Sequence, residues 1–434
     1  MKMAIQAALI LFTVFLILLA IGVPISISIG ISAIVTSLMV VPFDVAIFTI
    51  SQKMINGVGS FSLLAVPLFV LSGNIMNNGG VAKKLVNFAK VLGGRIPGSL
   101  AHTNVLGNML FGALSGSAVA ACAAIGGTMA PLQKEEGYDP AFSAAVNIAS
   151  SPAGMLIPPS GVLILFSLVA GGVSVSALFI AGYIPGILMG ASVMLVAFFH
   201  AKKHKYPVSQ RVSFKEALLV FLDALPSLLL IVIVIGGIVG GAFTATEGAA
   251  IAVIYPLILS MFYKTLTLEN MKDIILKTAV TTGVIMFLVA ASSAMSWIMA
   301  YTGIPQAISG LILSISTNKI VILLIMNITL LIVGTFMDLT PAVLIFTPIF
   351  LPIATQLGLH PVHFGMILVF NLCIGIMTPP VGSVLFIGCS VADVSIEKTI
   401  KPLLPFFAAL IIVLLLITYI PELSLFLPRL FNII

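Results

Sequence analysis

Long apolar runs separated by short polar segments dominate the sequence. A helix needs about 20 mostly apolar residues to cross the hydrocarbon core of a bilayer. Runs of this length predict full crossing helices at residues 4–21, 23–41, 60–78, 176–200, 217–240, 244–262, 281–301 and 402–420. The pattern therefore indicates an all-α polytopic membrane protein.

Two other apolar regions, 100–130 and 320–351, carry small and polar residues at their centres. The central sequences are Ala-Leu-Ser-Gly-Ser at 113–117 and Gly-Thr-Phe-Met-Asp-Leu-Thr-Pro at 334–341. We expect each half to be too short to cross the membrane, so each region is predicted to form a re-entrant helical hairpin. A turn at membrane depth is tolerated only where protein or a water-filled cavity covers it.

A double proline interrupts the apolar segment that follows each hairpin. Pro158-Pro159 lies within 141–170, and Pro379-Pro380 lies within 362–390. Proline has no backbone N–H and leaves a carbonyl of the preceding helical turn without its partner. We expect both segments to be discontinuous helices that cross the membrane, which brings the prediction to about ten crossings.

One shift of 221 residues places features of the first half of the chain on those of the second. The shift aligns Pro131 with Pro352, Gly137 with Gly358, Pro140 with Pro361, the two double prolines, Gly161 with Gly382, and Val173-Ser174 with Val394-Ser395. A gap of about three residues then aligns Asn147 with Asn371. Such self-similarity indicates an internal repeat, and we predict two units, 1–205 and 206–434.

The basic residues indicate that the two units are inverted. Four of them lie in 81–95, whereas the counterpart 304–319 holds only Lys319. In inverted repeats, a loop that is cytoplasmic in one unit has its counterpart on the other side of the membrane. Because cytoplasmic loops carry the excess of Lys and Arg, a loop that is basic in one unit is expected to be neutral in the other. With both termini outside, 15 of the 19 Lys and Arg fall in predicted cytoplasmic loops. Those loops are 81–95, 131–140, 201–216, 263–277 and 391–401, and 42–56 is a predicted outer loop.

The composition excludes soluble proteins. The 434 residues are 60% hydrophobic and 7% charged, whereas a soluble domain has about 25% charged residues. The net charge of +6 therefore reflects orientation in the membrane, and no nucleic-acid partner is expected. Cys122, Cys373 and Cys389 lie in apolar stretches and are predicted to be buried thiols. The sequence contains no Gly-x-x-x-x-Gly-Lys-Ser/Thr loop for ATP, so an ion gradient is expected to supply the energy.

Inverted repeats with helices broken at membrane depth are typical of secondary transporters. The interrupted segments are rich in hydroxyl, amide and carbonyl oxygens, which are the ligands of hard cations. We predict two sodium sites, with Na+ as the coupling ion. The first would use Ser115, Gly116, Ser117, Asn147, Ser150 and Pro152, and the second Gly334, Thr335, Asp338, Asn371, Gly375, Met377 and Thr378. The alternative for each Ser or Thr is a hydroxyl bonded to its own helix.

Asp338 and Glu247 are predicted to be the deep carboxylates. An ionisable side chain at membrane depth is a functional-site hypothesis by default. Asp338 aligns with Ser117, so it adds a negative charge at one of the two sites, and it is also suited to cap the helix that follows. Glu247 is interpreted either as a gate or site residue or as a helix cap. Proton coupling would need a chain of titratable groups, and these two carboxylates alone supply few of them, so sodium coupling is favoured over proton coupling.

Five short motifs occur together in the chain: Phe-Thr-Ala-Thr-Glu-Gly-Ala-Ala at 243–250, Ser-Gly-Ser at 115–117, Leu-Ile-Pro-Pro-Ser at 156–160, Gly-Thr-Phe-Met-Asp at 334–338 and Thr-Pro-Pro-Val-Gly at 378–382. With them the chain resembles, over essentially its whole length, the large membrane subunit of tripartite ATP-independent periplasmic (TRAP) transporters. The resemblance implies a sodium-coupled elevator transporter in a bacterial inner membrane. It also implies two partners, a small four-helix membrane subunit and a secreted periplasmic solute receptor. No extension precedes Met1, so we expect the small subunit to be a separate chain.

The resemblance also implies an organic acid as substrate. The overall similarity is greatest to sialic-acid systems, and C4-dicarboxylates are the alternative. By motif matching, the residues predicted to contact the substrate are Ser115, Asp338, Ser117, Thr246 and Glu247.

All three arginines, Arg95, Arg211 and Arg429, lie in predicted loops or near the end of the chain. We therefore expect helix N-termini and bound sodium to balance the charge of an anionic substrate. An anion channel stays open as a rival function. An enzyme is not expected, because the sequence places no nucleophile and base at one depth.

Overall fold

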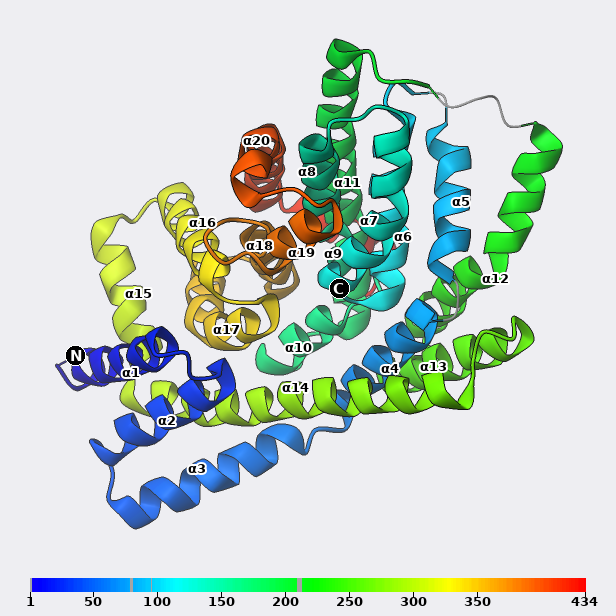
Figure 1. Ribbon diagram of the computed structural model, residues 1–434. Coiled ribbons are helices and arrows are strands. Elements are labelled where there is room, and N and C mark those ends of the chain that lie inside the picture. Colours follow the sequence, from blue (N-terminus) through cyan, green and yellow to red (C-terminus); the bar gives the residue numbers. More distant parts are fainter. Residues whose placement is uncertain (1, 79–80, 95, 209–212) are drawn as a thin grey trace.

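A computed structural model of the chain describes residues 2–78, 81–94, 96–208 and 213–434. Every regular element within these ranges is helical, as the apolar pattern predicted. The helices form two groups that pack against each other, and the long helix α14 (Leu268–Thr302) runs across the lower part of the molecule, above α3 (Phe43–Val58) (Figure 1).

The first group, which we call the scaffold, is organised around the long helix α14. That helix packs against α2, α3 and α4, and α4 packs in turn against α13. The scaffold consists of α1 (Lys2–Ala20), α2 (Ile25–Leu38), α3 (Phe43–Val58), the 3-10 turn η1 (Phe61–Leu64), α4 (Ala65–Asn78), α12 (Phe214–Val239), α13 (Ala245–Phe262) and α14 (Leu268–Thr302).

The second group, which we call the hairpin body, contains both interrupted regions and both double-proline segments. Its first half consists of α6 (Ser99–Ser115), α7 (Ala118–Glu135), α8 (Pro140–Ser150), α9 (Ala153–Leu156), α10 (Gly161–Val169) and α11 (Val175–His204). Its second half consists of α16 (Lys319–Phe336), α17 (Leu339–Gln356), α18 (Pro361–Gly375), α19 (Ser383–Val391), α20 (Ile396–Tyr419) and α21 (Glu422–Leu430).

Two amphipathic helices join the scaffold to the hairpin body. α5 (Val81–Gly93) follows α4 and packs against α6 and α12, whereas α15 (Ile304–Ile315) follows α14 and packs against α17 and α1. Each of these helices therefore contacts both groups.

The segment 42–56, which was predicted as an outer loop, is helical and forms α3. Asp44, Gln52 and Lys53 lower its mean hydropathy, although polar residues on one face of a helix are compatible with a helical span. The α3 helix meets the following helix, Phe61–Asn77, at an angle of 58°. In the second half of the chain the matching segment is α14, a single helix of 35 residues that includes most of the predicted loop 263–277.

The described residues contain eight helices that are long and apolar enough to cross a membrane, or up to ten when each bent pair is counted as one span. The number agrees with the prediction, but two of the eight, α16 and α17, are the halves of the second predicted hairpin, and α2 with 14 residues is shorter than the span predicted at 23–41. The hairpin halves are longer than expected: α6 has 17 residues, and α7, α16 and α17 have 18 each. At 1.5 Å per residue each half is about 26 Å long, slightly less than the hydrocarbon core of about 30 Å. Of these four helices, only the two of the second hairpin, α16 and α17, are long and apolar enough to count as candidate spans.

Residues that the repeat aligned occupy matching positions in the structure. Pro140 and Pro361 each begin a helix, α8 and α18. Gly137 and Gly358, which precede these helices, both have positive φ, at 79° and 75°. Both double prolines contain a cis peptide bond. The unit boundaries at 205 and 206 stay predictions.

The two halves of the hairpin body are interlocked. The second helix of each hairpin packs on the broken helix of the other half, α7 on α19 and α17 on α10. Gly388 of α19 lies against Ile148 and Cys122, and Gly365 of α18 lies against Phe166. The hairpin body therefore has one shared core. All three cysteines are buried in the structure, as predicted.

Candidate functional site

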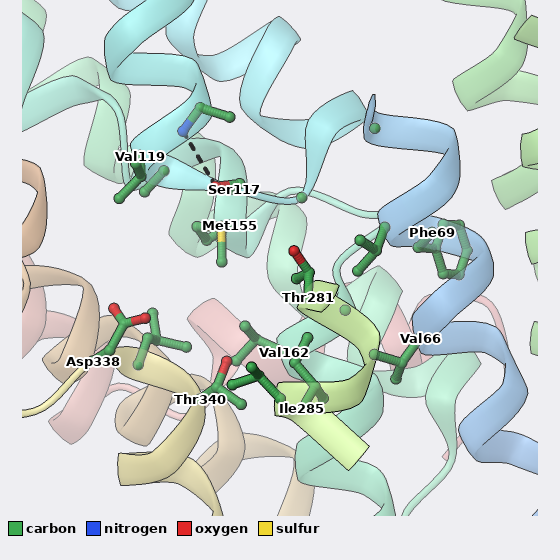
Figure 2. A pocket seen from close by; sticks show the side chains of 18 of the residues that line it. Val66, Phe69, Ser117, Val119, Met155, Val162, Thr281, Ile285, Asp338 and Thr340 are labelled. Carbon is green, nitrogen blue, oxygen red and sulfur yellow. Dashed lines mark hydrogen bonds between the residues drawn. The ribbon is translucent and has the colours of Figure 1, made fainter. Parts of the chain in front are cut away.

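A cavity of about 640 Å3 lies between the scaffold and the hairpin body. Both hairpin tips line it, the first with residues 114–120 and the second with residues 338–341. Figure 2 shows Ser117 and Asp338 entering the cavity from the two hairpins, with Thr281 of α14 and Phe69 of α4 on the scaffold side. Two interruptions that are 221 residues apart in the sequence thus meet at one cavity.

The first hairpin tip is a tight turn held by its own serines. Ser115 Oγ donates a hydrogen bond to the Ser117 carbonyl oxygen at 3.4 Å and accepts one from the Ser117 N–H at 3.4 Å. Ser117 caps α7, since its Oγ accepts from the Ala120 N–H at 3.2 Å. Gly116 between them has φ of 63°, a left-handed conformation that favours glycine. These bonds fix the serine oxygens at the edge of the cavity.

Asp338 stands at the corresponding start of α17, but its side chain makes no capping hydrogen bond to the helix. One carboxylate oxygen accepts a hydrogen bond from Ser383 Oγ at 3.4 Å. Within the part of the chain that the structure describes, Asp338 is the only charged residue that lines the cavity. Its carboxylate is therefore available to a cation or to a hydrogen-bond donor of a ligand.

Four helices begin at this cavity. The lining residues include the first residues of α2, α7, α10 and α17, which are Ile25, Ala118, Gly161 and Leu339. The N-terminus of a helix carries a partial positive charge and free N–H groups. The cavity therefore presents positive dipole ends to a ligand, in a wall with no described Lys or Arg.

The second predicted sodium set is partly assembled at the tip of the second hairpin. Gly334 and Gly375 are in backbone contact, since a Cβ on Gly334 would lie 2.8 Å from the Gly375 Cα. The Val381 N–H donates to the Thr335 carbonyl oxygen at 3.3 Å, which ties the tip to the broken helix. A Cβ on Gly382 would lie 2.9 Å from the Thr378 carbonyl oxygen. The hairpin tip and the helix break therefore meet at the backbones of Thr335 and Val381.

Met377 is fully buried beside this break, and the Thr378 hydroxyl donates to the Ile374 carbonyl oxygen of its own helix at 2.7 Å. Asn371 lies farther from the tip, where its Nδ2 donates to Asn327 Oδ1 at 2.6 Å. Asn327 in turn donates to Thr418 Oγ1 at 2.9 Å. The Asn371 side chain therefore belongs to a buried bridge between α16, α18 and α20.

The first predicted set is divided between two places. Ser115, Gly116 and Ser117 line the cavity, whereas Asn147 and Ser150 lie deeper and accept hydrogen bonds from Asn108 Nδ2 at 3.0 and 2.7 Å. Asn108 precedes Ser115 by two helical turns on α6, about 10 Å along the axis. The Pro152 carbonyl oxygen accepts from the Cys373 thiol at 3.8 Å. The deeper residues thus hold α6 and α8 together.

The sequence analysis missed a glycine pair that corresponds to Gly334 and Gly375. A Cβ on Gly112 would lie 2.9 Å from the Gly154 Cα, and this contact lies one helical turn before Ser115. Shifts of 222 and 221 residues carry these two glycines onto Gly334 and Gly375. Aligning the two repeat units would therefore have identified Gly112 and Gly154.

The structure does not bring Thr246 and Glu247 to the cavity. Thr246 Oγ1 donates to the Phe61 carbonyl oxygen at 3.4 Å. The Glu247 carboxylate accepts from the Thr244 N–H at 2.7 Å and from the Thr244 hydroxyl at 2.8 Å. Thr244 and Glu247 form a capping box at the start of α13, an arrangement that satisfies free N–H groups of a helix.

The scaffold wall of the cavity was also missed. It includes Asn74 and Asn77 of α4 and Thr281 of α14, and Asn74 Nδ2 donates to Thr278 Oγ1 at 2.9 Å. These residues lie inside segments that read as ordinary apolar spans, so only the packing of α4 on α14 identifies them. Of the arginines, Arg429 pairs with Glu422, whereas Arg95 and Arg211 lie outside the described residues.

Comparison with known proteins decides the family. The sequence model described as "Tripartite ATP-independent periplasmic transporter, DctM component" matches residues 12–423. The chain belongs to this family. A DctM-family protein is a transporter permease and not an enzyme, and membership implies a small membrane subunit and a periplasmic binding protein as partners.

Similar proteins span nearly the same length as this DctM-family chain. It is 58% identical to the protein YgiK of Salmonella typhimurium, over 97% of both chains. It is 39% identical to the sialic acid TRAP transporter large permease protein SiaM of Vibrio cholerae, over 88% of this chain and 89% of that one. It is 40% identical to the C4-dicarboxylate TRAP transporter large permease protein DctM of Pseudomonas aeruginosa, over 93% and 94%.

The fold of the DctM-family chain has a solved counterpart. The crystal structure of the Alcanivorax borkumensis YdaH transporter superimposes with a TM-score of 0.64, covering 86% of this chain and 88% of that chain at 12% identity. The likeness at this identity concerns the fold. The chain is therefore a multi-pass membrane permease of a bacterial TRAP transporter.

Proposed function

We propose that the chain performs sodium-coupled uptake of a sugar acid, such as sialic acid, across the bacterial inner membrane by an elevator movement of the hairpin body. The observation that carries the proposal is the cavity at which both hairpin tips and four helix N-termini meet. Its walls belong to two separate helix groups. A substrate held by one group is carried past the other when the groups slide.

Binding of an anionic substrate is supported by the charges at the cavity. No described Lys or Arg lines it, and the N-termini of α2, α7, α10 and α17 face it. Each N-terminus carries a partial positive charge of about one half. These dipoles together with sodium would balance a carboxylate, so substrate is expected to bind poorly without sodium.

Two sodium ions would enter as co-substrates at the two hairpin tips. Gly334, Thr335, Gly375, Met377 and Thr378 would offer oxygens to one, with Asp338 at its cavity side. Ser115, Gly116 and Ser117 would offer oxygens to the other, together with Gly112 and Gly154. The residues fit the ion, because hydroxyl and backbone carbonyl oxygens are ligands of hard cations and irregular backbone at helix breaks holds coupling ions in transporters.

Asp338 supports a hydroxylated acid over a C4-dicarboxylate. An ionised carboxylate accepts hydrogen bonds and donates none, so Asp338 would bind the hydroxyl groups of a sugar acid. The second carboxylate of a dicarboxylate would instead meet a like charge in a cavity with no described cationic side chain. A cavity of about 640 Å3 lies within the usual range for ligands larger than a C4 acid. C4-dicarboxylate uptake is the second candidate, named for the Pseudomonas aeruginosa relative.

The test is reconstitution of the permease with its small subunit and periplasmic receptor in liposomes. Uptake of radiolabelled sialic acid is measured with an inward sodium gradient, with a proton gradient alone and with neither. We expect uptake that requires both sodium and the receptor and that unlabelled sugar acids inhibit. Uptake of a C4-dicarboxylate instead would support the second candidate, and uptake driven by the proton gradient alone would overturn sodium coupling. Single-channel currents across a planar bilayer would overturn alternating access.

Asp338→Asn supplies the site-specific arm of this test. It is expected to reduce uptake at least about tenfold. The matched control is Asp393→Asn, at an exposed position with φ of 53° outside the cavity, a conformation that asparagine tolerates. Wild-type uptake with an unchanged sodium requirement in Asp338→Asn would rule out Asp338 as a site residue.

A further inference from the structure

Helix α4 of the scaffold crosses the tip of the first hairpin at Gly73. A Cβ built on Gly73 would lie 2.6 Å from the carbonyl oxygen of Ser115, 3.2 Å from its carbonyl carbon and 3.3 Å from its Cα. All three are backbone atoms, so no side-chain rotation relieves the overlap. Glycine is therefore the residue that lets the scaffold and this tip touch.

The scaffold side of the contact is anchored on both flanks of Gly73. Ser72 Oγ donates to the Ala252 carbonyl oxygen of α13 at 2.5 Å, and Asn74 Nδ2 donates to Thr278 Oγ1 of α14 at 2.9 Å. The α4 backbone at this level is thus bound to two neighbouring helices. It cannot retreat from the tip without breaking a buried or half-buried hydrogen bond.

The hairpin side is equally constrained. The Gly116 N–H donates to the Gly112 carbonyl oxygen at 2.8 Å, and Gly112 packs against Gly154 of α9. Ser115 lies between these fixed points. A methyl group on Gly73 would therefore have to separate the scaffold from the hairpin body, because neither backbone can yield locally.

We propose that Gly73 is a positioning residue that acts through Ser115. The hairpin tip contacts the scaffold at Gly73 in this docked conformation, and the contact must break when the hairpin body moves. The proposal rests on the elevator movement proposed above. A side chain at Gly73 disfavours the docked conformation and leaves the undocked one untouched. The ratio of the two populations depends exponentially on the free-energy difference between the conformations, about tenfold for each 1.4 kcal/mol.

The test measures the distance between the two helix groups in the assembled permease. One spin label is placed on the scaffold at Met261 of α13 and one on the hairpin body at Phe199 of α11, both exposed positions. The three native cysteines are buried, so the labels react at the introduced sites. Distance distributions are recorded by pulsed electron paramagnetic resonance with and without sodium, substrate and receptor.

Gly73→Ala is compared with Gly283→Ala, a helical glycine of α14 where an added Cβ meets no atom within 4 Å. We expect Gly73→Ala to lower the ratio of docked to undocked molecules by about tenfold or more, since overpacking of this size is strongly unfavourable. Gly283→Ala is expected to match the wild type. Gly73→Ala should remain folded, because the undocked conformation relieves the clash.

Two results would overturn the role of Gly73. One is a Gly73→Ala protein whose distance distribution equals that of Gly283→Ala, when the wild-type protein does change its distance between conditions. The other is loss of folding in Gly73→Ala, which would make Gly73 a packing requirement of every conformation. A wild-type protein with one distance under all conditions would instead overturn the elevator movement itself, and this role of Gly73 with it.

Discussion

The backbones of Gly334 and Gly375 touch where the second hairpin meets its broken helix, with only 2.8 Å between a Cβ placed on Gly334 and the Gly375 Cα. Gly112 and Gly154 repeat the contact at the first hairpin. Both contacts lie within one turn of a predicted sodium site. Glycine at these positions lets carbonyl groups of two segments approach a common point.

Gly334→Ala is therefore expected to weaken sodium binding while the permease still folds. The methyl group would push the hairpin away from the broken helix, and overpacking of this kind costs about 1–3 kcal/mol. If the displacement falls on the ion site, the sodium concentration for half-maximal uptake should rise about tenfold. The measurement is the sodium dependence of uptake in proteoliposomes, with thermal unfolding as a check on folding.

Gly127→Ala is the matched control for Gly334→Ala. Gly127 lies in a hairpin helix, α7, and an added Cβ there meets no atom within 4 Å. Its sodium dependence should equal that of the wild type. An unchanged sodium dependence in Gly334→Ala would show that the glycine contact serves packing alone.

The glycine pairs also show which parts of the candidate site could be predicted from the sequence alone. Gly334 and Gly375 were predicted as members of the second site, whereas Gly112 and Gly154 were not predicted, although the repeat aligns them with Gly334 and Gly375. Asn147 and Ser150 of the broken helix were assigned to the same sodium site as Ser115 because they are polar, but their partner is Asn108, two turns deeper. The hydrophobic pattern of the sequence locates the apolar helices and the breaks within them. Which buried polar group faces which depends on the packing of helices far apart in the sequence.

Glu247 illustrates the same limit, since the motif that holds it also reads as a helix start. In the structure its carboxylate is bonded to Thr244. Thr244→Ala should destabilise the start of α13 by about 0.5–2 kcal/mol, the usual range for an N-cap. Glu247→Ala should lower the melting temperature to a similar degree, and neither variant should change the half-saturating concentrations of sodium and substrate. The measurements are thermal unfolding and uptake kinetics.

Ser213→Ala is the control for the Thr244 and Glu247 variants, because Ser213 and Glu216 form the second capping box of the described chain, at the start of α12. A comparable drop in melting temperature is expected there. If Glu247→Ala abolished uptake while Thr244→Ala and Ser213→Ala retained it, Glu247 would be a gate and not a cap.

Asn327 links three helices of the hairpin body through Asn371 and Thr418. Asn327→Leu keeps the size of the side chain but leaves the buried Asn371 amide without this partner. An orphaned buried polar group costs about 1–3 kcal/mol, so the variant should unfold at a clearly lower temperature. Sodium dependence at a temperature where it is folded should stay near that of the wild type, because the bridge lies away from the hairpin tip.

Thr329→Val provides the comparison on the same helix, since Thr329 Oγ1 donates to the Ile325 carbonyl oxygen of its own helix at 2.8 Å. Its effect should be within about 0.5 kcal/mol. Equal losses in Thr329→Val and Asn327→Leu would contradict a specific role for the three-helix bridge. A large rise in the sodium requirement of Asn327→Leu would support the predicted assignment of Asn371 to the sodium site.

Lys84 ties the connecting helix α5 to the scaffold. Its ammonium lies 2.7 Å from the Asp223 carboxylate of α12 and 3.6 Å from the ring centroid of Tyr263. Burial alone would lower the pKa of Lys84, but Asp223 and Tyr263 together raise it above its ordinary value. A raised pKa means that the stabilisation is present at neutral pH and is lost only as the pH rises through the pKa of the folded protein.

A double-mutant cycle of Lys84→Ala and Asp223→Ala should therefore give a coupling energy that is constant between about pH 6 and pH 9. Because both side chains are partly exposed, the coupling should be no more than about 1 kcal/mol. The measurement is equilibrium unfolding of the purified permease in mixed micelles, with Lys83→Ala on the exposed side of α5 as the control. A coupling of zero, or one that disappears within this pH range, would mean that packing and not this ion pair holds α5 to α12. In that case Lys84→Ala and Lys83→Ala should destabilise the permease equally.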